Sequence, residues 1–285
     1  MRVAKFLGSH GATDASKIGM TGSDDILMLA PPRADARLSY GRDEHQFMDL
    51  RMPSLAASDS PPPRAQGPYP LAIAIHGGYW RAKYDLGYMG HVCAALSAKG
   101  IVTANLEYRR VGNAGGGWPG TFADIRAAYQ FLRQKAREHD FDPARVLVIG
   151  HSAGGQLGIC LAAHEPGVKV VISLAGVVDL QRAYELHLSN DAVVEYLGGT
   201  PGEVGDHYRE ADPMRLAVGA RQWLVHGAAD DVVPPEFSRD YVIAKQKKKE
   251  DARLVEIAGA GHFEVADPRS GSWKEVERVV VEGAG

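Results

Sequence analysis

The pattern of apolar and polar positions becomes regular near residue 71 and, apart from an interruption at about residues 176–220, continues to the end of the chain. Before it, Gln46–Arg51 alternates in a way that predicts an edge strand. Further strands are predicted by short apolar runs at Leu71–Ile75, Ile101–Leu106, Arg145–Ile149, Val168–Leu174, Gln222–Val225 and Ala252–Ile257. Helical spacing predicts helices at His91–Lys99, Thr121–Glu138, from Ser152 onward, Pro235–Lys247 and Ser272–Glu282.

This alternation of strands and helices favours an α/β fold, with a mostly parallel central sheet flanked by helices. We expect one domain over residues 39–285, with a small cap-like insertion at about residues 176–220, where the alternation is interrupted. Residues 1–38 lack sustained periodicity, so they predict an N-terminal arm, partly disordered. Ser54–Pro70 is rich in proline and small polar residues and predicts an irregular surface loop.

Net charge, the length of apolar runs and cysteine spacing argue against several classes of function. The chain has 285 residues, 45% of them hydrophobic, and a net charge of −3, which gives no basic field for nucleic acid or anionic lipid. No apolar run is long enough to span a bilayer or form a signal peptide, so we expect a cytoplasmic protein without membrane partners. Cys93 and Cys160 match no metal or redox spacing and predict core packing, with no metal or organic cofactor. Whether the chain forms a homodimer stays open.

The segment Gly150-His-Ser-Ala-Gly154 carries the strongest chemical signal. It follows the apolar run Val146–Ile149 and precedes the small and apolar residues Gln156–Ala163. A G-x-S-x-G pattern between a strand and a helix places its serine in a strained, exposed turn where a base can reach the hydroxyl. We therefore predict that Ser152 is a catalytic nucleophile.

A serine nucleophile needs a histidine base and an acid, which follow it on this type of fold in the order acid, then histidine. Among the five histidines after Ser152, only His262 also follows the carboxylate pair Asp230-Asp231. For the acid we favour Asp230, which follows the strand Gln222–Val225. Asp179, which follows the preceding strand, and Asp231, for which a capping role is expected, stay open as alternatives.

The segment His76-Gly-Gly-Tyr-Trp80 directly follows the first central strand, and its two glycines would let the backbone approach a substrate. Backbone N–H groups in such a turn, together with that of Ala153, would form an oxyanion hole. Aromatic residues gather in the segments expected around this rim, and we expect Trp80, Trp118 and Phe263 to line a substrate pocket.

Four blocks together resemble the α/β-hydrolase superfamily over about residues 40–285. They are His76–Trp80, Gly150–Gly154, His226–Pro234 and Gly261–Phe263. The H-G-G-x-W form resembles the branch that contains kynurenine formamidases and esterases of the hormone-sensitive-lipase type. The resemblance implies the α/β-hydrolase fold, and oxyanion donors at Gly78, Tyr79 and Ala153, with Gly77 shaping the turn. Tyr79 stands where the lipase branch usually has a third glycine.

We therefore expect a serine hydrolase that cleaves small carboxylic esters through an acyl-serine intermediate, as a carboxylesterase does. Hydrolysis of N-formyl aryl amides, as by an arylformamidase, is the alternative. A peptidase of the prolyl-oligopeptidase kind is more distant, because such enzymes usually carry an additional large domain. A non-enzymatic binding module on a hydrolase scaffold would normally lack one of the three catalytic residue types, all of which are present here.

Overall fold

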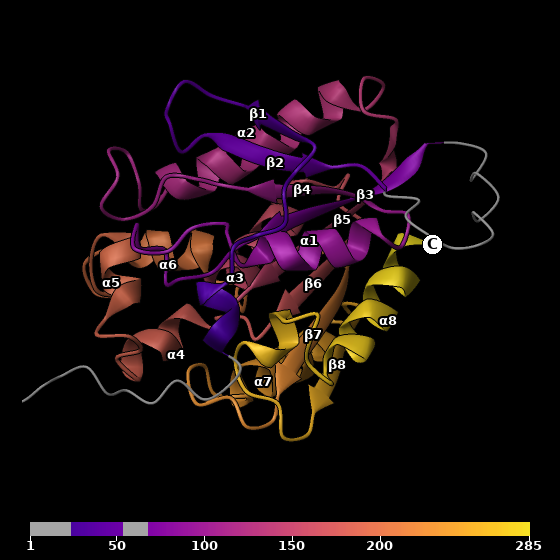
Figure 1. Ribbon diagram of the computed structural model, residues 1–285. Coiled ribbons are helices and arrows are strands. Elements are labelled where there is room, and N and C mark those ends of the chain that lie inside the picture. The colour runs from indigo at the N-terminus through magenta and orange to yellow at the C-terminus, as the bar shows by residue number, and fades with distance from the viewer. Residues whose placement is uncertain (1–23, 54–67) are drawn as a thin grey trace, which may run out of the picture.

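The computed structural model describes residues 24–53 and 68–285, and one eight-stranded sheet runs through this part of the chain (Figure 1). The strand order is β1-β2-β4-β3-β5-β6-β7-β8. The six strands from β4 to β8 in this order are parallel, whereas β2 pairs antiparallel with both β1 and β4. The strands are β1 (Ala36–Ser39), β2 (Phe47–Arg51), β3 (Tyr69–Ile75), β4 (Val102–Leu106), β5 (Phe141–His151), β6 (Val170–Leu174), β7 (Arg221–Gly227) and β8 (Ala252–Ile257).

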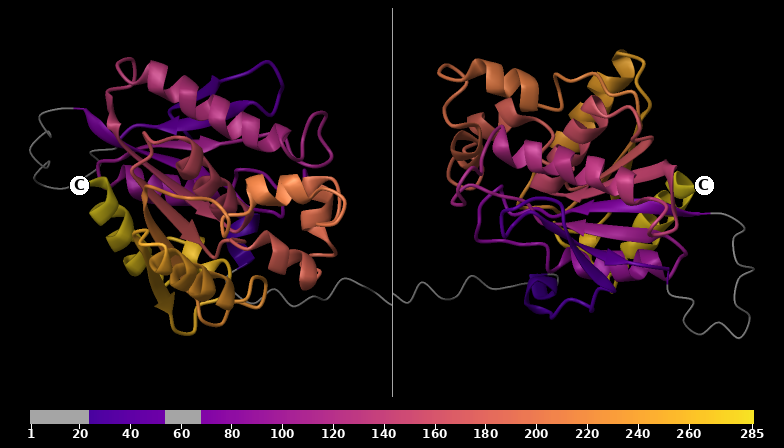
Figure 2. Two further views of the ribbon diagram at one scale, coloured as in Figure 1. Left: turned by 180° about the vertical axis from the view of Figure 1, so that it is seen from behind. Right: turned by 90° about the horizontal axis from the view of Figure 1, so that it is seen from above.

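Helices cover both faces of this sheet, as the opposite views show (Figures 1 and 2). One face packs against α1 and α8, and the other against α2, α3 and α7. The α-helices are α1 (Met89–Ser97), α2 (Gly120–Lys135), α3 (Ala153–His164), α4 (Leu180–Glu185), α5 (Ala192–Leu197), α6 (Gly205–Ala211), α7 (Glu236–Lys247) and α8 (Trp273–Ala284). Two 3₁₀ helices are η1 (Asp24–Met28) and η2 (Glu264–Ala266). This architecture confirms the predicted α/β fold.

The central strands are apolar on both sides because both of their faces are buried. In β3, Leu71, Ile73 and Ile75 pack into the core beneath α2 and α3, while Ala72 and Ala74 pack into the core beneath α1 and α8. Successive side chains of a strand point to opposite faces, so a strand covered on both faces reads as a continuous apolar run. This explains why these strands could be located from the sequence.

The N-terminal part of the sheet differs from the prediction. The strand expected at an edge, β2, lies between β1 and β4, and the edge of the sheet is β1. Within the range predicted as an arm, η1 and most of β1 form, and Ile26 is fully buried. The four residues of β1 alternate between half-buried and exposed, so they carry little apolar signal. Residues 1–23 and 54–67, which include most of the predicted arm and loop, lie outside the described residues.

The range predicted as a cap-like insertion contains the three short helices α4, α5 and α6.

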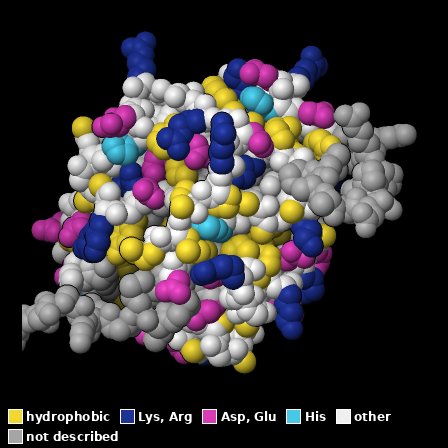
Figure 3. Space-filling model, viewed as in Figure 1, with side chains coloured by type: hydrophobic (Ala, Val, Ile, Leu, Met, Phe, Trp, Pro, Cys, Tyr) yellow, Lys and Arg dark blue, Asp and Glu magenta, His cyan; other side chains and the backbone are white. Residues whose placement is uncertain are grey.

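In the described part of the chain, no helix is both long and apolar enough to cross a bilayer. Lys and Arg side chains are interspersed with Asp and Glu over the face seen in Figure 3. Both cysteines are buried and unbridged, which agrees with their predicted packing role.

Candidate active site

Ser152 lies in a tight turn between β5 and α3, as the G-x-S-x-G pattern predicts. Its φ of 56° and ψ of −120° fall in a region that L residues rarely occupy, so the turn is strained. The flanking glycines are required by close backbone approach. A Cβ on Gly150 would lie 2.0 Å from the carbonyl oxygen of Gly154, and one on Gly154 would lie 2.1 Å from that of Ile75. The turn thereby presents the serine at the carboxyl end of β5.

A cavity of about 230 Å³ contains both Ser152 and His262 in its wall. The rest of the wall is apolar or aromatic, and none of the described Asp, Glu, Lys or Arg side chains lines it. It is formed by Leu27, Gly78, Tyr79, Tyr84, Tyr88, His151, Val232 and Phe263. Such a cavity suits a small ligand without formal charge, because a buried charge needs a partner.

Asp230 orients the imidazole of His262. The distance from His262 Nδ1 to Asp230 Oδ2 is 2.7 Å, and the carboxylate is fully buried. Asp230 Oδ1 accepts hydrogen bonds from the backbone N–H groups of Val232 and Val233, both at 2.9 Å. Burial raises the pKa of Asp230, but hydrogen bonds from His226 and His262 outweigh it, so this pKa lies below its ordinary value. An anionic Asp230 holds the proton of His262 on Nδ1 and leaves Nε2 as the basic nitrogen.

The other two candidate acids have different surroundings. Asp179 is the N-cap residue of α4, where its Oδ1 accepts a hydrogen bond from the N–H of Arg182 at 2.9 Å. Asp231 is exposed. The structure therefore pairs His262 with Asp230 and with neither alternative.

The turn after β3 carries the predicted oxyanion donors. Gly77 packs directly against the nucleophile turn, since a Cβ there would lie 2.8 Å from Ser152 Cβ. Gly78 has a φ of 106° and Tyr79 a φ of 52°, and both line the cavity. Within the described residues, no backbone carbonyl accepts a hydrogen bond from the N–H of either one. Ala153 opens α3, where N–H groups have no acceptor inside the helix. These three N–H groups are thus available to a ligand.

Of the three predicted pocket aromatics, Phe263 lines the cavity and the two tryptophans do not. Trp80 is 1% exposed, stacks on Tyr196 with ring centroids 4.4 Å apart, and donates from Nε1 to Gln156 Oε1. Trp118 stacks on Phe122 at 5.4 Å. The structure thus does not place the predicted Trp80 and Trp118 in the wall of this cavity, because each ring stacks on another aromatic ring instead.

Several residues around the site were not among the predicted site residues, and four of them are informative. His226 Nε2 lies 3.1 Å from Asp230 Oδ2, and its position four residues before this acid could have drawn attention. Tyr88 and His151 line the cavity, although His151 occupies the unspecified position of G-x-S-x-G. Leu27 also lines the cavity and comes from η1, inside the range predicted as an arm. Neither Tyr88 nor Leu27 carries a local sequence signal.

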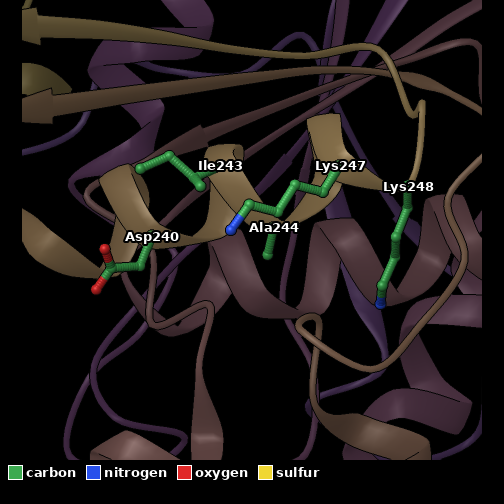
Figure 4. Close-up of a pocket in the computed structure, with 5 residues that line it drawn as sticks. All are labelled: Asp240, Ile243, Ala244, Lys247 and Lys248. Carbon is green, nitrogen blue, oxygen red and sulfur yellow. The ribbon is translucent and has the colours of Figure 1, made fainter.

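A second hollow lies on the outer side of α7 and has different chemistry. It is lined by Asp240, Ile243, Ala244, Lys247 and Lys248, all from this helix or its C-terminal end (Figure 4). Its lining includes neither a histidine nor a hydroxyl or thiol nucleophile. Across residues 24–53 and 68–285, no group of three His, Cys, Asp or Glu side chains is arranged to hold a metal ion. The cavity at Ser152 is therefore the candidate active site.

Comparison with known sequences gives a consistent picture. The BD-FAE family model matches residues 60–244. The probable isoprenylcysteine alpha-carbonyl methylesterase ICMEL2 of Arabidopsis thaliana is 23% identical, over 83% of this chain and 59% of that protein. Versiconal hemiacetal acetate esterase of Dothistroma septosporum is 24% identical, over 72% of this chain and 64% of that protein. The chain thus spans less than two thirds of the length of these relatives.

Solved structures share the fold at low sequence identity. A truncated carbohydrate esterase from gut microbiota superposes with a TM-score of 0.74 and 20% identity, covering 90% of this chain and 99% of that one. Esterase B of Lactobacillus rhamnosis has a TM-score of 0.73 and 17% identity, with 92% and 89% covered. These likenesses show that the chain has the α/β-hydrolase fold.

Proposed function

The chain belongs to the BD-FAE family, and on that premise we propose that it is a serine esterase for small carboxylic esters. One observation carries the proposal: Ser152 and His262 line the same cavity, and Asp230 accepts a hydrogen bond from His262. The names of the relatives support it, since both curated proteins compared above are esterases.

The reaction would run through an acyl-serine intermediate. His262 Nε2 takes the proton of Ser152 as Oγ attacks the carbonyl carbon of the ester. The negative charge that forms on the carbonyl oxygen is stabilised by the N–H groups of Gly78, Tyr79 and Ala153, each worth on the order of 3 kcal/mol. His262 then gives its proton to the departing alcohol, and water activated by the same nitrogen hydrolyses the acyl-serine.

The cavity wall supports a neutral, apolar substrate. The side chains of Leu27, Val232 and Phe263 offer apolar contact, and no described charged side chain is present to pair with a charged group on a substrate. An N-formyl aryl amide would use the same groups, so arylformamidase activity is the second candidate. The ratio of kcat/KM for N-formylkynurenine to that for a short-chain aryl ester separates the two.

Turnover of p-nitrophenyl acetate tests the proposal. Ser152→Ala removes the nucleophile, so we expect kcat to fall by about 10⁴-fold or more with no change in the fold. Ser97→Ala is the matched control, because Ser97 is a buried serine of α1 outside the cavity. Wild-type turnover that survives Ser152→Ala would refute the proposed function.

A further inference from the structure

A chain of buried hydrogen bonds connects three segments of the site that are far apart in the sequence. The N–H of Gly77, in the turn with the oxyanion donors, donates to Tyr88 Oη at 2.7 Å. Tyr88 Oη lies 2.8 Å from His151 Nδ1. His151 Nε2 lies 3.0 Å from the carbonyl oxygen of His262. Tyr88 and His151 are 6% and 1% exposed, so water does not compete for these bonds.

The direction of each bond follows from the chemistry of its groups. Burial lowers the pKa of His151 to about 3, so its imidazole is neutral and carries one N–H. A carbonyl oxygen can only accept, which places that hydrogen on Nε2 and makes Nδ1 an acceptor. Burial raises the pKa of Tyr88, which keeps its phenol protonated and able to donate to Nδ1. Every polar atom along the chain is therefore paired.

Ring packing holds the same groups in place. The rings of Tyr88 and His151 meet edge to face with centroids 5.5 Å apart, and those of His151 and His262 lie 4.7 Å apart. Tyr88 also meets Phe263 edge to face at 6.0 Å. The hydrogen bonds and the close packing together hold these groups in a single arrangement. Two loops that contacted only solvent would not be restricted in this way.

We propose that Tyr88 and His151 are positioning residues, which hold the turn carrying Gly78 and Tyr79 in register with the segment carrying His262. The inference rests on the proposed function. Gly77 immediately precedes the two oxyanion donors, and His151 immediately precedes Ser152, so the bridge passes beside every reacting group. Misplacement of a catalytic group by about 1 Å can cost on the order of 100-fold in rate. The bridge fixes these groups relative to one another before a substrate arrives.

Tyr88→Phe tests this role, because it removes the hydroxyl and keeps the ring that packs on His151 and Phe263. Gly77 N–H and His151 Nδ1 lose their partner, so the two loops are no longer joined. We expect kcat for p-nitrophenyl acetate to fall on the order of 10-fold to 100-fold, with KM changed by less than about twofold. Rates are expressed per active site titrated with a fluorophosphonate, so that misfolded enzyme does not count.

One further variant serves as a control, and a pair of His151 variants gives a second test. Tyr241→Phe removes a buried hydroxyl that donates to Gln222 outside the cavity, and it should lower the melting temperature while leaving kcat per titrated site unchanged. His151→Gln keeps one amide donor and one carbonyl acceptor, whereas His151→Leu keeps neither. We expect kcat to decrease in the order wild type, His151→Gln, His151→Leu, and this series tests the bridge even where Tyr88→Phe does not fold.

The outcomes separate a positioning role from a structural one. If Tyr88→Phe lowers only the melting temperature, or raises KM with kcat unchanged, the inference is overturned. Equal kcat values per titrated site for His151→Gln and His151→Leu would overturn it as well. Failure of the proposed function would be seen separately, as turnover that persists in Ser152→Ala. That result would overturn the proposed function and, with it, the positioning role.

Discussion

Two groups of side chains near the carboxyl ends of the central strands have opposite surroundings. Ser152 and His262 line a cavity, where His262 donates a hydrogen bond to Asp230 and the N–H of Ser152 donates to the carbonyl oxygen of Leu174. Trp80 and Trp118 are close in sequence to the proposed oxyanion turn and to α2, respectively, yet they lie in an aromatic cluster with Tyr196 and Phe122. The first group faces a cavity and the second group faces the core.

The difference shows which kind of sequence signal reports on a site. The backbone geometry around Ser152 requires the observed glycines, because Gly150 and Gly154 approach other main-chain atoms too closely for any side chain. No backbone geometry requires an aromatic residue, which packs equally well in a cavity wall and in a core. Its place depends on a partner elsewhere in the chain, as Tyr196 decides for Trp80.

The largest expected effect separates the two carboxylates that follow neighbouring strands. Asp230→Asn should lower kcat on the order of 10⁴-fold, because an amide does not hold His262 in the same tautomer or stabilise its imidazolium. Asp179→Asn, which alters a helix cap, should change kcat by less than about threefold. Steady-state kinetics on both variants checks this. A greater loss of kcat in Asp179→Asn would mean that the acid is wrongly assigned.

The aromatic cluster should respond in stability and not in rate. Trp118→Ala removes the ring stacked on Phe122, and we expect the free energy of unfolding to fall by about 2 kcal/mol. Because Trp118 does not line the cavity, kcat per titrated site should stay at the wild-type value. Urea unfolding and active-site titration measure the two quantities. A loss of kcat without a loss of stability would indicate that Trp118 contributes to the substrate pocket.

A smaller effect is expected at the wall that η1 contributes. Leu27→Ala enlarges the cavity, so kcat/KM for p-nitrophenyl hexanoate should rise by about tenfold relative to that for the acetate. Met28→Ala is the matched control, because Met28 is 77% exposed and does not line the cavity. An unchanged chain-length preference in Leu27→Ala would show that η1 does not bound the acyl or alcohol site.

The last effect is spread over several pH units and concerns the pH dependence of stability. The pKa of His151 falls from 6.5 to about 3 on folding, mainly through burial, so below pH 6.5 the unfolded chain binds a proton that the folded chain does not. The free energy of unfolding should therefore decrease as pH falls from 6.5 toward 3, by at most about 1.4 kcal/mol per pH unit from this group.

Comparison with a variant isolates this contribution from those of His262, His226 and Asp230, which also lie near His151. His151→Gln has no titrating group at this position, so its free energy of unfolding should depend less on pH over the same range. Urea unfolding of both proteins at several pH values measures the difference. Parallel pH curves would indicate that His151 is not held neutral by burial.

The sequence predicts those parts of the fold that local patterns determine. The apolar runs of β3 to β7 mark strands covered on both faces, and the glycine spacing around Ser152 marks the nucleophile turn. It does not predict β1, whose residues alternate only between half-buried and exposed, or η1, which is too short to show a helical period and whose burial depends on the elements packed against it. The pairing of His262 with Asp230 instead of Asp179 also required the structure, because it is set by loop geometry.

Long-range contacts account for the other residues that were missed. Tyr88 reaches the site from the segment before α1, and nothing in its neighbours along the chain indicates a partner at Gly77 or His151. Leu27 lines the cavity although it lies more than 100 residues before Ser152 in the sequence. Such contacts between distant segments are the part of a site that a single sequence does not encode locally.

The most direct test of the proposed acyl transfer at Ser152 is mass spectrometry after labelling with a fluorophosphonate. A hydroxyl activated by His262 should form one adduct per chain, located on the peptide that contains Ser152, and labelling should slow sharply in His262→Ala. An unlabelled protein, or an adduct on another residue, would contradict the account.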